Sequence, residues 1–122
     1  MWIHSSIGFF SAVRDHFHAG HVLVRARFQE DIERLADMVA QPEFAGAVPK
    51  IERTPDRDYL FRISIGNLTW GHVLQRLGEE ITYTNFKSSV HGDRVRDDAY
   101  AECWRQMRKA QQHASERPLK KV

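Results

Sequence analysis

Three arginines occur where apolar and polar residues alternate, a pattern that places them on one face of a β-sheet. Arg25 and Arg27 lie in the segment 21–28, and Arg62 lies in the segment 59–65. Successive side chains of a strand point to opposite faces, so the arginines project outward if Val24 and Phe61 face the core. The planar guanidinium group holds phosphate or carboxylate through paired hydrogen bonds. The pattern predicts a surface for an anionic partner.

The N-terminal segment adds aromatic residues to this predicted face. We interpret residues 3–13 as one strand bent at Gly8, with Ile3, Ile7, Phe9 and Val13 facing inward. This register sends Trp2 and Phe10 outward. Cations interleaved with aromatics are typical of sheets that bind single-stranded nucleic acid. Arg, Trp and Phe are also enriched at protein interfaces, so an acidic protein partner and a homodimer stay open.

One irregular stretch carries side chains suited to acid–base chemistry and phosphate binding: Tyr83, Asn85, Lys87 and His91. An active site, if there is one, is expected here, and Lys87 is included among the predicted binding residues. The sequence contains no phosphate-cradling glycine loop and no nucleophile elbow. We therefore favour binding over catalysis and predict no catalytic residue.

The histidine cluster His16-x-His18-x-x-His21 has spacing that would suit a metal ion. Only Asp15 stands nearby to complete a ligand set, so we interpret the cluster as an exposed histidine-rich turn without metal. Cys103 is the single cysteine and lies on the apolar stripe of a helix, where a buried thiol is expected. No cofactor is predicted.

The order of the predicted elements indicates an α+β domain. Alternating segments predict strands at 3–13, 21–28, 50–53 and 59–65, paired as two hairpins. Helical spacing predicts helices near 30–40, 67–78 and 94–112 and a helical turn capped by Asn85. The order β-β-α-β-β-α-α favours an antiparallel four-stranded sheet with helices on one face. We expect one domain over residues 1–112 and a disordered tail over 113–122.

Composition is that of an ordinary globular protein. The chain has 122 residues, of which 42% are hydrophobic and 28% charged, with a formal net charge of +2. One cysteine excludes an intramolecular disulfide, and no apolar run reaches the roughly 20 residues that span a bilayer. These features predict a cytoplasmic protein without membrane attachment. Arginine supplies 13 of the 18 basic residues, which favours recognition of an anion over mere solubility.

Short motifs spread along most of the chain resemble a widespread, uncharacterised family of bacterial and phage proteins of similar length. The motifs are Gly8-Phe9-Phe10-Ser11, Val24-Arg25-Ala26-Arg27 with Asp31 and Leu35, Asp58-Tyr59 with Arg62, Tyr83-Thr84-Asn85-Phe86-Lys87, and Tyr100 with Trp104 and Met107. The resemblance implies a compact domain in a bacterial or mobile-element setting. It assigns no chemistry and no functional residue.

The sequence thus predicts a small binding module that uses the open face of a sheet. Its predicted contacts are Arg25, Arg27, Arg62, Trp2, Phe10 and Lys87. The partner is either nucleic acid or an acidic protein. One alternative is a protein-directed inhibitor or adaptor of the kind that phages encode against host defence systems. A second alternative is a small enzyme with its site in the stretch 83–91.

Overall fold

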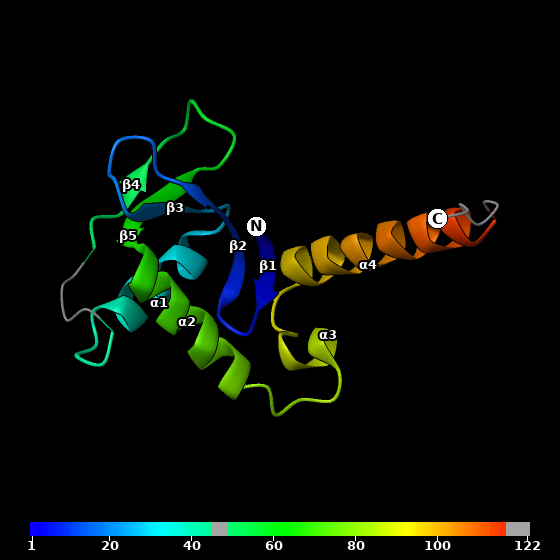
Figure 1. The fold of residues 1–122 in the computed structure, drawn as a ribbon. Helices are drawn as coiled ribbons and strands as arrows, with labels where there is room; N and C mark the ends of the chain where they lie inside the picture. Colours follow the sequence, from blue (N-terminus) through cyan, green and yellow to red (C-terminus); the bar gives the residue numbers. More distant parts are fainter. Residues whose placement is uncertain (45–48, 117–122) are drawn as a thin grey trace, which may run out of the picture. The chain divides into compact units, whose positions relative to one another are not determined.

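The computed structural model describes residues 1–44 and 49–116 (Figure 1). Contacts divide the chain into two compact units, Met1–Thr82 and Tyr83–Val122, which we call the sheet unit and the helical unit. The expectation of one domain over residues 1–112 rests on the last helix packing against the same core as the strands. In the described residues the sheet unit contains every strand, so it holds the predicted arginine-bearing segments.

The sheet has five strands, and the prediction of four is wrong at the N-terminus. Residues 3–13 form a hairpin of β1 (Trp2–Ser5) and β2 (Gly8–Arg14), with Ser5 paired with Gly8 across the two-residue turn. Pairing across such a turn places Ile3 and Phe10 on the same face. A continuous strand would place them on opposite faces, so the turn reverses the predicted orientation of every residue in β2.

The remaining strands follow the predicted hairpin pattern more closely. They are β3 (His21–Ala26), the short β4 (Glu52–Arg53) and β5 (Phe61–Gly66). All neighbours are antiparallel, in the order β1-β2-β3-β5-β4. The central strand β3 therefore pairs with β2 on one side and β5 on the other. The prediction of an antiparallel α+β fold is confirmed at this level.

Two helices cover one face of the sheet and close the hydrophobic core. Helices α1 (Gln29–Val39) and α2 (Asn67–Glu79) lie side by side against the strands (Figure 1). The buried cluster joins their apolar sides to the inward side chains of β2, β3 and β5, including Phe10, Val24, Phe61, Ile63, Ile32, Leu35, Trp70, Val73 and Leu77. Because both helices use the same face, side chains of the opposite parity face away from this core.

A close approach between the β1–β2 hairpin and α1 fixes where the helix begins. The carboxylate of Asp31, in the first turn of α1, is fully buried and accepts a 3.0 Å hydrogen bond from the amide of Phe9. Gly8 has φ of +142°, and a Cβ at this position would overlap the Asp31 carboxyl group. Only glycine leaves room for this contact, so Gly8 and Asp31 lock the hairpin to the helix.

The helical unit contains the short α3 (Phe86–Ser89) and the long α4 (Arg94–Ser115). The predicted Asn85 cap is confirmed, because its Oδ1 accepts a 3.0 Å hydrogen bond from the Ser88 amide. Asp93 caps α4 in the same way, through the Arg96 amide. The predicted disordered tail starts at residue 113, but α4 continues to Ser115, so this boundary is wrong. The rest of the predicted tail, residues 117–122, lies outside the described residues.

The apolar stripe of α4 is not the buried surface that its spacing predicts. Tyr100 is buried, whereas Cys103, Trp104 and Met107 are exposed, so the expectation of a buried thiol is wrong. Among the described residues of the helical unit, only the four-residue α3 packs against this 22-residue helix, and it covers a small part of the stripe. Among the described helices, none has the length and apolarity to cross a membrane.

Candidate functional site

A row of side chains crosses the open face of the sheet from the edge strand β1 to β5. Arg25 in β3 pairs with Arg62 in β5, and Ser11 in β2 pairs with Arg25 on its other side. Trp2 in β1 pairs in turn with Ser11. Residues directly opposite each other in paired strands share a face. We call this face, defined by Trp2, Ser11, Arg25 and Arg62, the arginine face.

Arg25 is half-buried and is held in place by neighbours that do not neutralise it. Its Nη2 donates a 2.8 Å hydrogen bond to Ser11 Oγ, and its guanidinium lies 4.7 Å from the centre of the buried Tyr59 ring. Its Nε is buried and has no hydrogen-bond partner in the described residues. The guanidinium is therefore positioned with donor capacity to spare.

Arg62 is more deeply buried, with 9% of its surface exposed. Its Nε donates a 3.1 Å hydrogen bond to Thr54 Oγ1. Burial lowers the pKa of Arg62, and the positive charges of Arg57 and Arg25 lower it further. Glu52 is the register partner of Arg62 in β4 and acts in the opposite direction on this pKa. Asp56 also raises this pKa, so two cations and two carboxylates act on Arg62.

Neither guanidinium of the arginine face forms an ion pair with any carboxylate in the described part of the chain. Like charges directly opposite in a sheet are destabilising, and removing a charge from water costs several kcal/mol unless it is paired. An anion bound between Arg25 and Arg62 would relieve both costs. Arg25 and Arg62 therefore define the candidate anion site.

Asp15 anchors a polar network beside the arginines. Its Oδ2 accepts a 2.6 Å hydrogen bond from Ser64 Oγ and lies 2.9 Å from His18 Nδ1, while its Oδ1 accepts from the Phe17 amide. His21 Nδ1 lies 3.1 Å from the same Ser64 hydroxyl. The Ser64 and Phe17 hydrogen bonds hold the pKa of Asp15 well below its usual range. The network fixes the β2–β3 loop against β5.

These components line a single cavity of about 620 Å³ in the sheet unit. The loop contributes Asp15, Phe17 and His18, and the strands contribute Arg25 and Arg62. Other lining residues include Arg14, Leu23, Glu52, Thr54, Arg57 and Ser64. A volume of this size lies within the usual range for small-ligand sites, so the cavity has room for more than one small ion.

Two residues of the predicted histidine cluster, His16 and His18, line this cavity. His18 is tied to Asp15, and His21 to Ser64. No group of three or more His, Cys, Asp or Glu residues within 1–44 and 49–116 is arranged to hold a metal ion. The cluster therefore positions the loop that closes one side of the cavity.

Arg27 lies near this face, but its guanidinium group already pairs with Asp58. Its Nη1 lies 3.3 Å from Asp58 Oδ1 and donates a 3.1 Å hydrogen bond to the Asp58 carbonyl. Its guanidinium also lies 4.1 Å from the centre of the Tyr59 ring, which it shares with Arg25. These contacts give Arg27 a role in fixing Tyr59, and the anion site is formed by the other two predicted arginines.

The two predicted aromatic contacts have opposite outcomes. Trp2 is exposed and lies in the row of the arginine face, as its predicted orientation requires. Phe10 is completely buried in the core, so its assignment to the open face is wrong. The reason is the turn between β1 and β2, which reverses the parity of β2. Phe9, predicted to face inward, stacks on His4 at 4.5 Å between ring centres.

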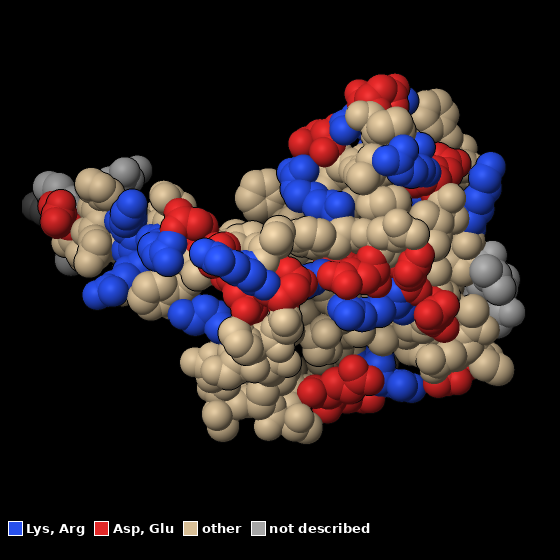
Figure 2. All heavy atoms as spheres, turned by 180° about the vertical axis from the view of Figure 1, so that it is seen from behind, with Lys and Arg blue, Asp and Glu red and all other residues tan. Residues whose placement is uncertain are grey.

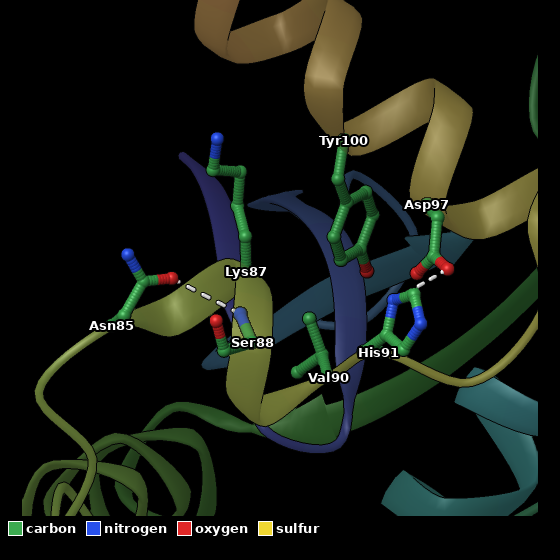
Figure 3. Close-up of a pocket in the computed structure, with 7 residues that line it drawn as sticks. All are labelled: Asn85, Lys87, Ser88, Val90, His91, Asp97 and Tyr100. Atoms are coloured by element: carbon green, nitrogen blue, oxygen red, sulfur yellow. Dashed lines mark hydrogen bonds and ion pairs between the residues drawn. The ribbon is translucent and has the colours of Figure 1, made fainter.

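Lys87 belongs to a second cavity, in the helical unit. This cavity is lined by Asn85, Lys87, Ser88, Val90, His91, Asp97 and Tyr100 (Figure 3). His91 Nδ1 lies 2.7 Å from Asp97 Oδ2, which resembles the carboxylate–imidazole pairs that act as general bases. The predicted grouping of Asn85, Lys87 and His91 around one cavity is therefore present.

The orientation of the other side chains does not complete an active site there. Figure 3 shows the Lys87 amine directed away from His91, and it lies 4.5 Å from the centre of the Trp104 ring. The Tyr100 hydroxyl accepts a 2.8 Å hydrogen bond from Arg96 Nη1. The Tyr83 ring packs against Phe86. The arginine face, with its uncompensated charge, is the better candidate.

The sequence does not indicate the polar residues around the two arginines. Ser11 and Thr54 bind the guanidinium groups, and Asp15, Arg57 and Ser64 line the same cavity. Strand parity places Ser64 on the open face but indicates no binding or structural role for it. The others lie in turns or on strands of misjudged parity, and no local pattern links positions as distant as 15 and 64. Comparison of the chain with protein-family models, with curated proteins and with solved structures found no match.

Proposed function

We propose that this protein is a non-enzymatic binding module that holds single-stranded nucleic acid on its arginine face. The observation that carries the proposal is the register pairing of Arg25 with Arg62 on adjacent strands, with no carboxylate of the described residues within ion-pair distance of either guanidinium group. Glu52 lies opposite Arg62 in β4 but forms no ion pair with it. Such an arrangement costs stability in the free protein and is relieved by a bound anion. Phosphate fits the planar donor arrays of the two guanidinium groups.

Exposed aromatic rings near the arginines favour nucleic acid over an acidic protein. Trp2 is 77% exposed in the same cross-strand row, and Phe17 is 88% exposed at the wall of the cavity. Strands are about 4.8 Å apart, so Trp2 lies two strands, or roughly 10 Å, from Arg25. Bases stack on rings of this kind at about 1–3 kcal/mol each, while the phosphates contact arginine.

The charge distribution favours a short footprint over a long electrostatic track. On the side of the molecule seen in Figure 2, Lys and Arg side chains alternate with Asp and Glu side chains over much of the surface. The formal net charge is only +2. Specific contacts at the arginine face must therefore supply most of the affinity, and few phosphates are neutralised.

The test is binding of a fluorescein-labelled 12-nucleotide DNA strand of mixed sequence, measured by anisotropy at several salt concentrations. We expect Arg25→Gln and Arg57→Gln each to weaken binding about tenfold or more and to flatten the plot of log affinity against log salt by almost one. Arg57 is exposed, so its substitution tests the cavity without endangering the fold. Trp2→Ala should weaken binding while leaving the salt slope unchanged.

Two matched controls remove the same charge elsewhere. Arg27→Gln breaks the pair with Asp58, and Lys87→Gln removes a cation of the helical unit. Both should bind the strand within about twofold of the unmodified protein. If the two controls lose as much affinity as Arg25→Gln, the loss reflects the net charge of the protein, and the proposal is overturned. Binding of an acidic peptide such as polyglutamate, with no binding of the strand, would overturn it in favour of an acidic protein partner.

A further inference from the structure

The charge of the cavity exceeds what one internal phosphate of a strand supplies. Four arginines line it, Arg14, Arg25, Arg57 and Arg62, against the two carboxylates of Asp15 and Glu52, which leaves a formal excess of two positive charges. The charge of Arg57 acts on Arg62. An internal phosphodiester carries one negative charge. A terminal phosphate monoester carries about 1.5 to 2 negative charges at neutral pH, with three strong acceptor oxygens.

The carboxylates in the wall do not occupy the hydrogen-bond donors of Arg25 and Arg62. Asp15 directs its oxygens to Ser64, His18 and the Phe17 amide, and it forms no ion pair with an arginine within the described residues. Glu52 acts on Arg62 only at a distance beyond an ion pair. The donors of Arg25 and Arg62 that remain are therefore matched best by a dianion with several acceptor oxygens.

The shape of the site also favours the end of a strand. Residues of the β2–β3 loop and of the β4–β5 turn line the cavity together with residues of β3 and β5, whereas a continuing strand is bound along a groove. Its volume of about 620 Å³ suits a phosphate together with its terminal nucleoside. The ring of Phe17 forms part of the wall and offers a stacking surface for the last base.

We infer that the cavity beneath the β2–β3 loop is a subsite for the terminal phosphate of a single strand, bound between Arg25 and Arg62. This inference rests on the proposed function and adds to it a preference for phosphorylated ends. The remainder of the strand then leaves the cavity and crosses the arginine face toward Trp2.

The experiment compares four unlabelled competitors against the labelled 12-nucleotide strand. Three have the same 12-nucleotide sequence with a 5′-phosphate, a 3′-phosphate or hydroxyl groups at both ends. The fourth is a 13-nucleotide strand with hydroxyl ends, which adds one internal phosphodiester. We expect at least one end-phosphorylated strand to compete about tenfold better than both hydroxyl-ended strands. Arg57→Gln should reduce this preference severalfold, and Arg27→Gln should preserve it.

Each outcome separates the two proposals. If all four strands bind equally well, the terminal subsite is wrong and the proposed nucleic-acid function stands. If the 13-nucleotide strand gains as much as the phosphorylated strands, total charge explains the preference and the subsite is also wrong. If none of the strands binds, both proposals are overturned. Circular dichroism of each variant confirms that a lost preference is not lost folding.

Discussion

The carboxylate of Asp15 and the hydroxyl of Ser64 are joined by a 2.6 Å hydrogen bond across 49 positions of the chain. Asp15 begins the β2–β3 loop, and Ser64 lies in β5 on the open face of the sheet. The same carboxylate accepts from the Phe17 amide and contacts His18. The buried Asp15 carboxylate thus sets the position of the β2–β3 loop, which lines the cavity that contains Arg25 and Arg62.

Acid should remove the contribution of Asp15 to stability. Its folded-state pKa is lowered, chiefly by Ser64 and then by the Phe17 amide. The contribution is therefore fully present above the pKa of the unfolded chain, about 3.9, and is lost as the pH falls from there through the folded value. We expect the urea midpoint of the unmodified protein to exceed that of Asp15→Asn clearly at pH 7 and much less at pH 2.5. An equal difference at both pH values would contradict the assignment.

Two leucines of α2 should differ in how much they stabilise the core. Leu77 is buried, whereas Leu74 is only partly buried, although their helical spacing predicts burial of both. Leu77→Ala should cost about 2–5 kcal/mol, and Leu74→Ala should cost less than about 2 kcal/mol because its cavity opens toward solvent. Chemical denaturation of both variants measures the difference. A larger loss at Leu74 would mean that α2 is rotated about its axis.

Two glycine-to-alanine substitutions should have opposite signs. At Gly8, the added methyl group meets the Asp31 carboxylate and the positive φ is strained, so we expect a loss of about 1–3 kcal/mol or more. At Gly71, within α2, no atom lies within 4 Å of the added group, and alanine favours the helix by about 0.5–1 kcal/mol. Thermal unfolding of both variants tests the pair, and an unchanged or raised melting temperature for Gly8→Ala would argue against the close contact with Asp31.

Alternation predicted the orientation of the central strands because each is a single uninterrupted segment with one buried face. Val24 and Ile63 are buried, and Arg25 and Arg62 face the other way, as expected. The rule failed at residues 3–13, where a two-residue turn interrupts a pattern that looks continuous. Strand parity carries information only within one strand, and the turn at Ser6 and Ile7 has no Asn-Gly or Asp-Gly signal.

The candidate site was predictable only in its charged residues. Arg25 and Arg62 follow from parity, but their supporting groups come from distant segments brought together by the sheet order. Thr54 contacts Arg62 from the β4–β5 turn, and Ser11 contacts Arg25 from a strand of misjudged orientation. The ion pair between Arg27 and Asp58 depends likewise on the packing of Arg27 against Tyr59. Tertiary contacts, which have no local sequence signal, decide which arginines keep unused donors.

The last prediction concerns residues 1–82 as an isolated fragment. The buried hydrophobic cluster consists of residues between Phe10 and Leu77, all in the sheet unit. The cavity that contains Arg25 and Arg62 is lined by residues between Val13 and Ser64, in the same unit. A core supplied within one compact unit of this size is sufficient for independent folding. We expect the fragment to unfold cooperatively on heating and to bind the 12-nucleotide strand within about threefold of the full chain. The substitution Arg25→Gln should weaken binding by the fragment as it does in the full chain. A folded fragment that no longer binds would move the binding site to the helical unit, where Lys87 and the His91–Asp97 pair would become the residues to test.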